Sequence, residues 1–187
     1  TDDYAFADCI NLKQVSIPFS VTSIGKESFS MCSSLKQITI PSSVTEIGEG
    51  CFYGCSSIKY VKIPSSVTKI GESAFRWCLS LVEVIMPNSI KSIGMNAFMA
   101  CSSLEKIEIP NSLQSINNHC FAFCQSLVKI VIPPSVTFIG DFAFYACSSL
   151  KSVVIPSSVT SIGEEAFSGC SELKDFAIPS TVIEIKK

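Results

Sequence analysis

The stretch CSSLKSVVIPSSVTSIGEEAFSG, residues 147–169, recurs along the whole chain with a period of 23 residues. Proline occupies positions 18, 41, 64, 87, 110, 133, 156 and 179. Cysteine occupies positions 9, 32, 55, 78, 101, 124, 147 and 170, and phenylalanine occupies positions 6, 29, 52, 75, 98, 121, 144 and 167. Three residue types on one period exclude chance, so the 187 residues hold about eight copies of one repeat.

One copy of the repeat can be interpreted locally. Residues 35–40 alternate apolar and polar side chains, which predicts a short strand, and Pro41 ends it because proline has no N–H for a ladder. Residues 44–47 form a second extended piece. We expect Gly48 to permit a reversal of the chain, and residues 49–54 to form a short helical or 3₁₀ turn.

One such coil cannot bury its own apolar face, so successive coils must stack, and residues 23 apart then lie in columns. We expect a right-handed solenoid with a short-stranded parallel β-sheet on the concave face. Its convex face would carry short 3₁₀, helical or extended turns. At strand spacing, eight coils make a rod of roughly 38 Å. Residues 1–187 form a single domain without a linker.

The two ends of the chain carry no polar capping module, which a solenoid needs for solubility. Thr1 begins partway through a coil, and Lys187 stops at nearly the same repeat position. We therefore expect a fragment of a longer array. Exposed apolar residues at the end, Ile178, Val182 and Ile185, would favour end-to-end self-association.

The repeat resembles the leucine-rich repeat of the BspA-like family. The pattern is L-K-x-I-x-I-P-S-S-V-T-x-I-G-x-x-A-F-x-x-C-S-S, and residues 155–163 and 166–170 match it residue by residue. The resemblance runs from about Tyr4 to Ile185 and implies a leucine-rich repeat solenoid. It also implies a surface protein that adheres to host or matrix proteins, located at the cell surface or secreted.

The composition excludes several classes of protein. With 47% hydrophobic and 16% charged residues, the chain has enough apolar side chains to collapse and is not disordered. Its apolar stretches are far shorter than the roughly 18 residues of a membrane span, so we expect no membrane insertion. The net charge of −2 argues against a nucleic-acid partner. Lysines at one repeat position and acids at another are interpreted as two solvated edges of opposite sign.

The ten cysteines are interpreted as buried free thiols that act as small hydrophobic groups. Disulfides between neighbouring coils are allowed by distance, but parallel side chains in register give an unfavourable dihedral angle. No C-x-x-C occurs and four ligands do not converge, so no metal or cofactor is expected. His119 and Cys120 are expected to point apart, and no other catalytic arrangement is present, so we do not expect an enzyme.

The candidate binding residues lie at outward-facing positions whose residue type varies from repeat to repeat. On the sheet face, apolar or aromatic residues occupy positions that are polar in other coils: Tyr60, Ile85, Val131, Val154 and Ala177. They form a contact strip, or they reflect the ordinary β-propensity of valine in a parallel sheet. A second cluster lies in the sixth coil, where Phe138 and Phe142 occupy positions that are polar in the neighbouring coils and Tyr145 follows on the same turn. It anchors a partner, or it packs against a further domain or a symmetry mate.

We therefore predict a non-catalytic protein–protein interaction module. The periodicity alone implies only an extended interaction surface, and the adhesive role comes from the family resemblance. The alternative is an intracellular scaffold or regulatory repeat domain, because many unpaired thiols suit a reducing, cytoplasmic compartment. The absence of an N-x-S/T sequon favours the same alternative.

Overall fold

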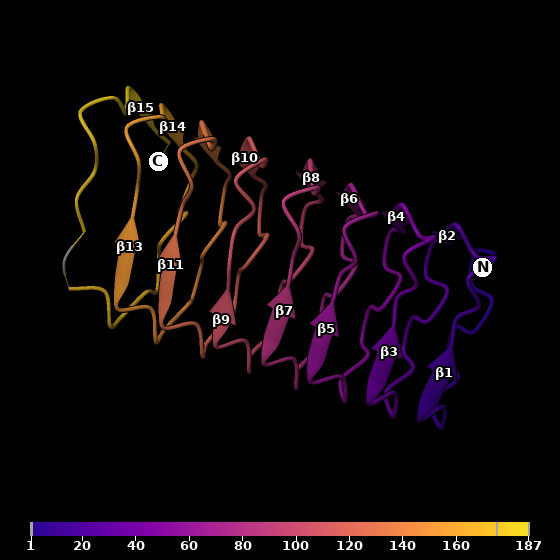
Figure 1. Cartoon of the computed structure of the whole chain (residues 1–187). Coiled ribbons are helices and arrows are strands. Elements are labelled where there is room, and N and C mark those ends of the chain that lie inside the picture. The colour runs from indigo at the N-terminus through magenta and orange to yellow at the C-terminus, as the bar shows by residue number, and fades with distance from the viewer. Residues whose placement is uncertain (1, 175, 187) are drawn as a thin grey trace.

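The computed structural model describes residues 2–174 and 176–186; Thr1 and Lys187, which entered the expectation about the ends, lie outside them. The chain winds into a row of stacked coils, with the N- and C-termini at opposite ends of the row (Figure 1). Each strand pairs in parallel with the strand 23 residues further on, as in Val15 with Ile38. The predicted parallel solenoid is confirmed.

Two series of short strands run along the coils. The first comprises β1 (Gln14–Ser16), β3 (Gln37–Thr39), β5 (Tyr60–Lys62), β7 (Glu83–Ile85), β9 (Lys106–Ile107), β11 (Lys129–Val131) and β13 (Ser152–Val154). The second comprises β2 (Ser23–Ile24), β4 (Glu46–Ile47), β6 (Lys69–Ile70), β8 (Ser92–Ile93), β10 (Ser115–Ile116), β12 (Phe138–Ile139), β14 (Ser161–Ile162) and β15 (Glu184–Ile185). The first series forms the sheet face, and its central residue in each strand points into the core.

The sheets are not continuous. On the sheet face the strands group as β1-β3, β5-β7-β9 and β11-β13, and the second series groups as β2-β4-β6-β8 and β10-β12-β14-β15. The ladder is therefore open between β3 and β5, between β9 and β11, and between β8 and β10. Two of these three openings lie on the sheet face, where they shape the surface described below.

A stack of phenylalanine rings forms the centre of the core. Neighbouring rings from Phe6 to Phe167 lie nearly parallel, with centroids 5.2 to 5.7 Å apart. The six interior rings are fully buried: Phe29, Phe52, Phe75, Phe98, Phe121 and Phe144. Leucine, isoleucine, valine and cysteine columns complete the core around them. Each coil thus buries its apolar face only against its neighbours, as a solenoid must.

The segment that follows the recurrent glycine and includes the phenylalanine, such as residues 72–77, forms turns, and no helix occurs among residues 2–174 and 176–186. Two positions in each coil have left-handed backbone angles, for example Trp77 with φ 61° and Phe142 with φ 55°. A left-handed residue cannot continue a right-handed helix. Its N–H instead donates to the following coil, as from Trp77 to the Met99 carbonyl at 2.9 Å. These inter-coil bonds stabilise a conformation that costs a non-glycine residue about 1–2 kcal/mol.

The recurrent glycine serves a purpose other than the predicted one. Gly48 and Gly71 are not in the left-handed region. A Cβ added to Gly71 would lie 2.6 Å from the Gly48 carbonyl carbon, so glycine is required because successive coils approach closely there. Asn117 occupies this position in one coil and donates from Nδ2 to the Ile93 carbonyl at 2.6 Å, next to the opening between β8 and β10.

Candidate functional site

The cysteine column is structural. All ten cysteines are free; Cys9 is exposed, Cys170 is half-buried and the other eight are buried. Seven thiols donate to the carbonyl of the phenylalanine 26 residues earlier, at 3.1 to 3.3 Å. Burial raises the pKa of the Cys78 thiol well above its ordinary value, so this thiol stays protonated and can donate. The prediction of buried free thiols is confirmed for eight cysteines but not for Cys9 and Cys170 near the two ends, and the hydrogen bond explains why the position is cysteine.

The chain offers no metal site among the described residues, because no three His, Cys, Asp or Glu side chains gather there. His119 is half-buried and stacks on Phe142 with ring centroids 4.8 Å apart, whereas Cys120 is fully buried in the core. A histidine held against a phenylalanine ring is not placed to activate a core thiol. Among the described residues there is also no helix that is long and apolar enough to cross a membrane.

The sheet-face candidates are exposed, as expected. The exposed fractions are 62% for Tyr60, 53% for Ile85, 52% for Val131 and 54% for Val154, and Ala177 is exposed as well. Val131 and Val154 are register partners on β11 and β13, so their side chains lie next to each other. The five residues do not form one continuous strip, because Glu108 separates Ile85 from Val131 in the same column.

The structure places three of these residues in two grooves, one at each opening of the sheet face, and Val154 and Ala177 line neither groove. The β3–β5 groove has a volume of about 680 Å³, and Tyr60 and Ile85 line it. The β9–β11 groove has a volume of about 820 Å³, and its lining includes Val131 together with Val128, Pro133 and Pro134. Sequence reasoning missed Val128, which is 43% exposed. The signal was present, because Val128 occupies a repeat position that is lysine in five coils.

The second predicted cluster is only partly assembled. Phe142 and Tyr145 meet edge to face, with ring centroids 5.7 Å apart, and the structure adds His119 and Phe123 to them. Phe138 lies on β12, a different part of the same coil. Phe138, Phe142 and Tyr145 are all half-buried rather than fully exposed. The rings therefore cover one another in part and leave a smaller exposed aromatic area than the sequence predicted.

The fold and the exposed sheet face define a leucine-rich repeat solenoid. The profile of the BspA-type leucine-rich repeat region matches six copies, over residues 1–101 and 91–187. The chain belongs to this family, as its repeat indicated. Proteins built from such repeats are typical protein-interaction modules and are typically non-catalytic. A search among curated proteins finds no match.

Solved structures support the same assignment. A leucine-rich repeat protein of T. pallidum is 35% identical, with a TM-score of 0.73, over 88% of this chain and 73% of that one. One from Bacteroides ovatus is 27% identical, with a TM-score of 0.72, over 98% of this chain and 71% of that one. A leucine-rich cell surface protein of Faecalibacterium prausnitzii is 31% identical, with a TM-score of 0.51, over 99% of this chain and 62% of that one.

Proposed function

We propose that the chain is a non-catalytic binding module that adheres to host or matrix proteins at the cell surface or after secretion. The observation that carries the proposal is the pair Val131 and Val154, two adjacent valines that are both more than half exposed on a rigid sheet face. Water-exposed sheet faces ordinarily carry polar residues, and adjacent exposed apolar side chains are typical of contact surfaces. The likeness to a cell surface protein of Faecalibacterium prausnitzii supports the location.

The free thiols do not oppose a location outside the cell. They favoured the alternative, an intracellular scaffold, because an oxidising compartment converts accessible thiols to disulfides. The eight buried cysteines are inaccessible, and burial raises the pKa of thiols such as Cys101, which removes the reactive thiolate. Buried thiols of this kind are inert, so they are compatible with either compartment.

The binding test uses the purified chain and its sheet-face variants. The double variant Val131→Glu with Val154→Glu places two charges in the contact surface and should abolish binding to a matrix protein that the unmodified chain binds. Immobilised fibronectin, laminin and collagen serve as probes. The matched control is Gln14→Glu with Ser16→Glu, because these exposed residues of β1 lie on the sheet face, line neither groove and change the charge by the same amount. Equal loss of binding in both variants contradicts a role for the valine pair.

The location is tested separately by surface labelling of intact cells with a membrane-impermeant amine reagent. Labelling of exposed lysines without lysis is expected for a surface protein. If the chain is labelled only after lysis, the adhesive role is wrong and the intracellular scaffold takes its place.

A further inference from the structure

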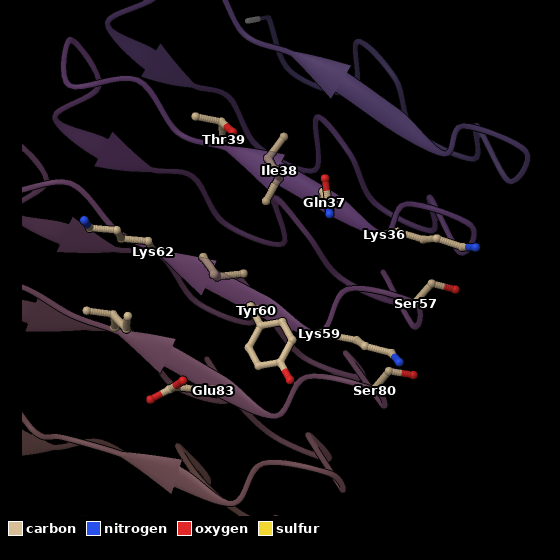
Figure 2. Close-up of a pocket in the computed structure, with 12 residues that line it drawn as sticks. Lys36, Gln37, Ile38, Thr39, Ser57, Lys59, Tyr60, Lys62, Ser80 and Glu83 are labelled. Atoms are coloured by element: carbon tan, nitrogen blue, oxygen red, sulfur yellow. The ribbon is translucent and has the colours of Figure 1, made fainter.

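The β3–β5 groove has a chemical character that the rest of the sheet face lacks. Figure 2 shows Tyr60 in the middle of the groove, Lys36 and Lys59 together near one end beside Ser57 and Ser80, and Lys62 at the other end of β5. Among the described residues, Glu83 is the one acidic side chain that lines it. Three lysines against one glutamate give the groove a positive charge, although the whole chain carries a net charge of −2.

The lysines of this groove have no acidic partner. Among residues 2–174 and 176–186, salt bridges join Lys26 to Glu49, Lys69 to Glu46 and Lys186 to Asp141, and none includes a lysine of the groove. The acids that follow the second strands, such as Glu49, bind lysines on their own side of the coil. They therefore do not neutralise the groove.

Stacking like charges in a column carries a cost. Lys13, Lys36 and Lys59 occupy the same repeat position in three successive coils. Equivalent residues of neighbouring coils lie about 4.8 Å apart, and like charges at that spacing repel. In the next three coils the same position holds Val82, Glu105 and Val128, so the fold does not require lysine there. An unpaired cationic column that the fold does not need points to an anionic partner.

The opening of the ladder shapes the groove. Where neighbouring strands of the sheet face pair, the residue at this position donates its N–H to the preceding coil, as Lys36 does to the Lys13 carbonyl at 3.1 Å. Within the described residues, the Lys59 N–H makes no such bond to Lys36. The Ser57 hydroxyl donates to the Ser33 carbonyl at 2.6 Å, whereas the equivalent Ser80 donates its backbone N–H to the Ser56 carbonyl. β3 and β5 remain unpaired, and the groove lies beside Tyr60.

The groove also offers apolar contact. Tyr60 and Ile85 are 62% and 53% exposed, and both line it next to the lysines. An extended peptide places alternate side chains on the same face, about 7 Å apart. It can therefore set carboxylates on the lysines and apolar side chains on Tyr60 and Ile85. The β9–β11 groove has a different character, because Lys106 and Lys129 are balanced there by Glu105 and Glu108.

We propose that the β3–β5 groove binds an extended acidic segment of the protein partner, with its carboxylates on Lys36, Lys59 and Lys62 and an apolar side chain on Tyr60. This inference rests on the proposed function, because it names the chemistry of the partner that the sheet face takes. The phenol hydroxyl of Tyr60 and the hydroxyl of Ser80 can donate further hydrogen bonds to carboxylate oxygens. Charge complementarity of this kind sets specificity and association rate.

The test measures fluorescence anisotropy of a labelled ten-residue peptide of alternating Asp and Val. The double variant Lys36→Glu with Lys59→Glu is expected to weaken its binding by about tenfold or more. The matched control is Lys151→Glu with Lys174→Glu, which changes the same repeat position by the same charge and should weaken binding less than about twofold. Tyr60→Ser is expected to weaken binding as well, at unchanged net charge. A peptide of alternating Lys and Val is expected not to bind.

Each other outcome overturns the inference. If both charge variants lose peptide binding equally, long-range attraction to the whole chain holds the peptide and the groove does not. If the acidic peptide does not bind at all, the groove is not a site for an acidic segment. Binding of heparin without binding of the peptide identifies a sulfated polysaccharide as the partner class. The adhesion assay separates this inference from the proposed function. If the chain binds matrix proteins but not the peptide, only the inference about the groove is wrong. If the chain binds the peptide but no matrix protein, the inference about the groove stands and the proposed adhesion is contradicted.

Discussion

The thiol of Cys78 donates a hydrogen bond to the carbonyl oxygen of Phe52, 3.2 Å away and 26 residues earlier in the chain. The same carbonyl accepts the backbone N–H of Cys55 at 3.1 Å. One oxygen thus joins its own turn to the next coil, and both of its lone pairs are used although it lies in the core. The relationship repeats along the column and makes cysteine a specific requirement of the stack.

Replacement of Cys78 by alanine tests this relationship. Cys78→Ala removes the hydrogen bond and leaves a small cavity, so we expect the free energy of unfolding to fall by about 1–3 kcal/mol. Urea denaturation followed by circular dichroism measures the change. Cys9→Ala is the control, because Cys9 is exposed at the same repeat position and should have little effect. Equal losses at Cys9 and Cys78 would contradict a structural role for the thiol bond.

The buried thiols predict a loss of stability in alkali. Burial raises the pKa of Cys32 and of Cys170 from the ordinary 9.0 to about 11. The folded chain therefore keeps protons that the unfolded chain releases, so this contribution to stability is full below about pH 9 and is lost as the pH rises toward about 11. Denaturation at several pH values measures it. The double variant Cys32→Ala with Cys170→Ala should show a shallower decline over that window.

The close approach of coils at the recurrent glycine predicts a sensitive position. A Cβ at residue 71 would lie 2.6 Å from backbone atoms of Glu49 and Gly48, so Gly71→Ala forces the coils apart. We expect a loss of about 1–3 kcal/mol in the free energy of unfolding. Asn117→Gly is the informative comparison, because that coil has already adapted to a side chain. If the free energy of unfolding of Gly71→Ala equals that of the unmodified chain, the neighbouring coils can move apart at this position without a loss of stability.

The phenylalanine stack predicts a large effect in the interior. Phe98 is fully buried and has ring partners at 5.4 and 5.6 Å on its two sides. Phe98→Ala should lower the free energy of unfolding by about 3–5 kcal/mol, as other large-to-small core changes do. Phe6 is 39% exposed and has one such partner, so Phe6→Ala should cost less than half as much. Thermal denaturation of the two variants checks the order.

We expect substitutions in the aromatic cluster of the sixth coil to weaken binding without lowering the stability of the fold. Phe138 and Phe142 are half-buried and lie outside the main core, so Phe138→Ser with Phe142→Ser should leave the fold intact and weaken binding of a matrix protein. Circular dichroism and the adhesion assay measure the two effects. Glu165→Ser changes the repeat position of Phe142 in the next coil and serves as the control. Retained binding together with lost stability would assign these rings to packing.

The repeated features of the fold were predictable because the residue pattern behind each of them recurs about eight times in the sequence. The phenylalanine column of Phe98 and the cysteine column of Cys78 follow from the period alone, and so does the parallel register of the strands. The left-handed turn residues were not predictable. Trp77 and Phe142 adopt these angles only because the next coil accepts their N–H groups, and neither residue type favours them.

The candidate site was harder to predict than the fold. Exposure of Tyr60 and Val131 followed from their place in the repeat. The opening beside Tyr60 did not, because Ile38 and Val61 on its two sides follow the same repeat pattern as the residues of paired strands. The loss of strand pairing between two such coils has no signature in a single sequence.

The side-chain hydrogen bonds between coils span only 22 to 26 residues, as in Ser66 to Val44 and Cys101 to Phe75. If a gene gains or loses a segment of 23 codons, each side-chain donor of the encoded chain therefore still meets an equivalent acceptor in the neighbouring coil. Unequal recombination between copies can lengthen or shorten the array without a new core. Binding surfaces such as the β3–β5 groove can then be duplicated, moved or deleted as units while the rod remains folded.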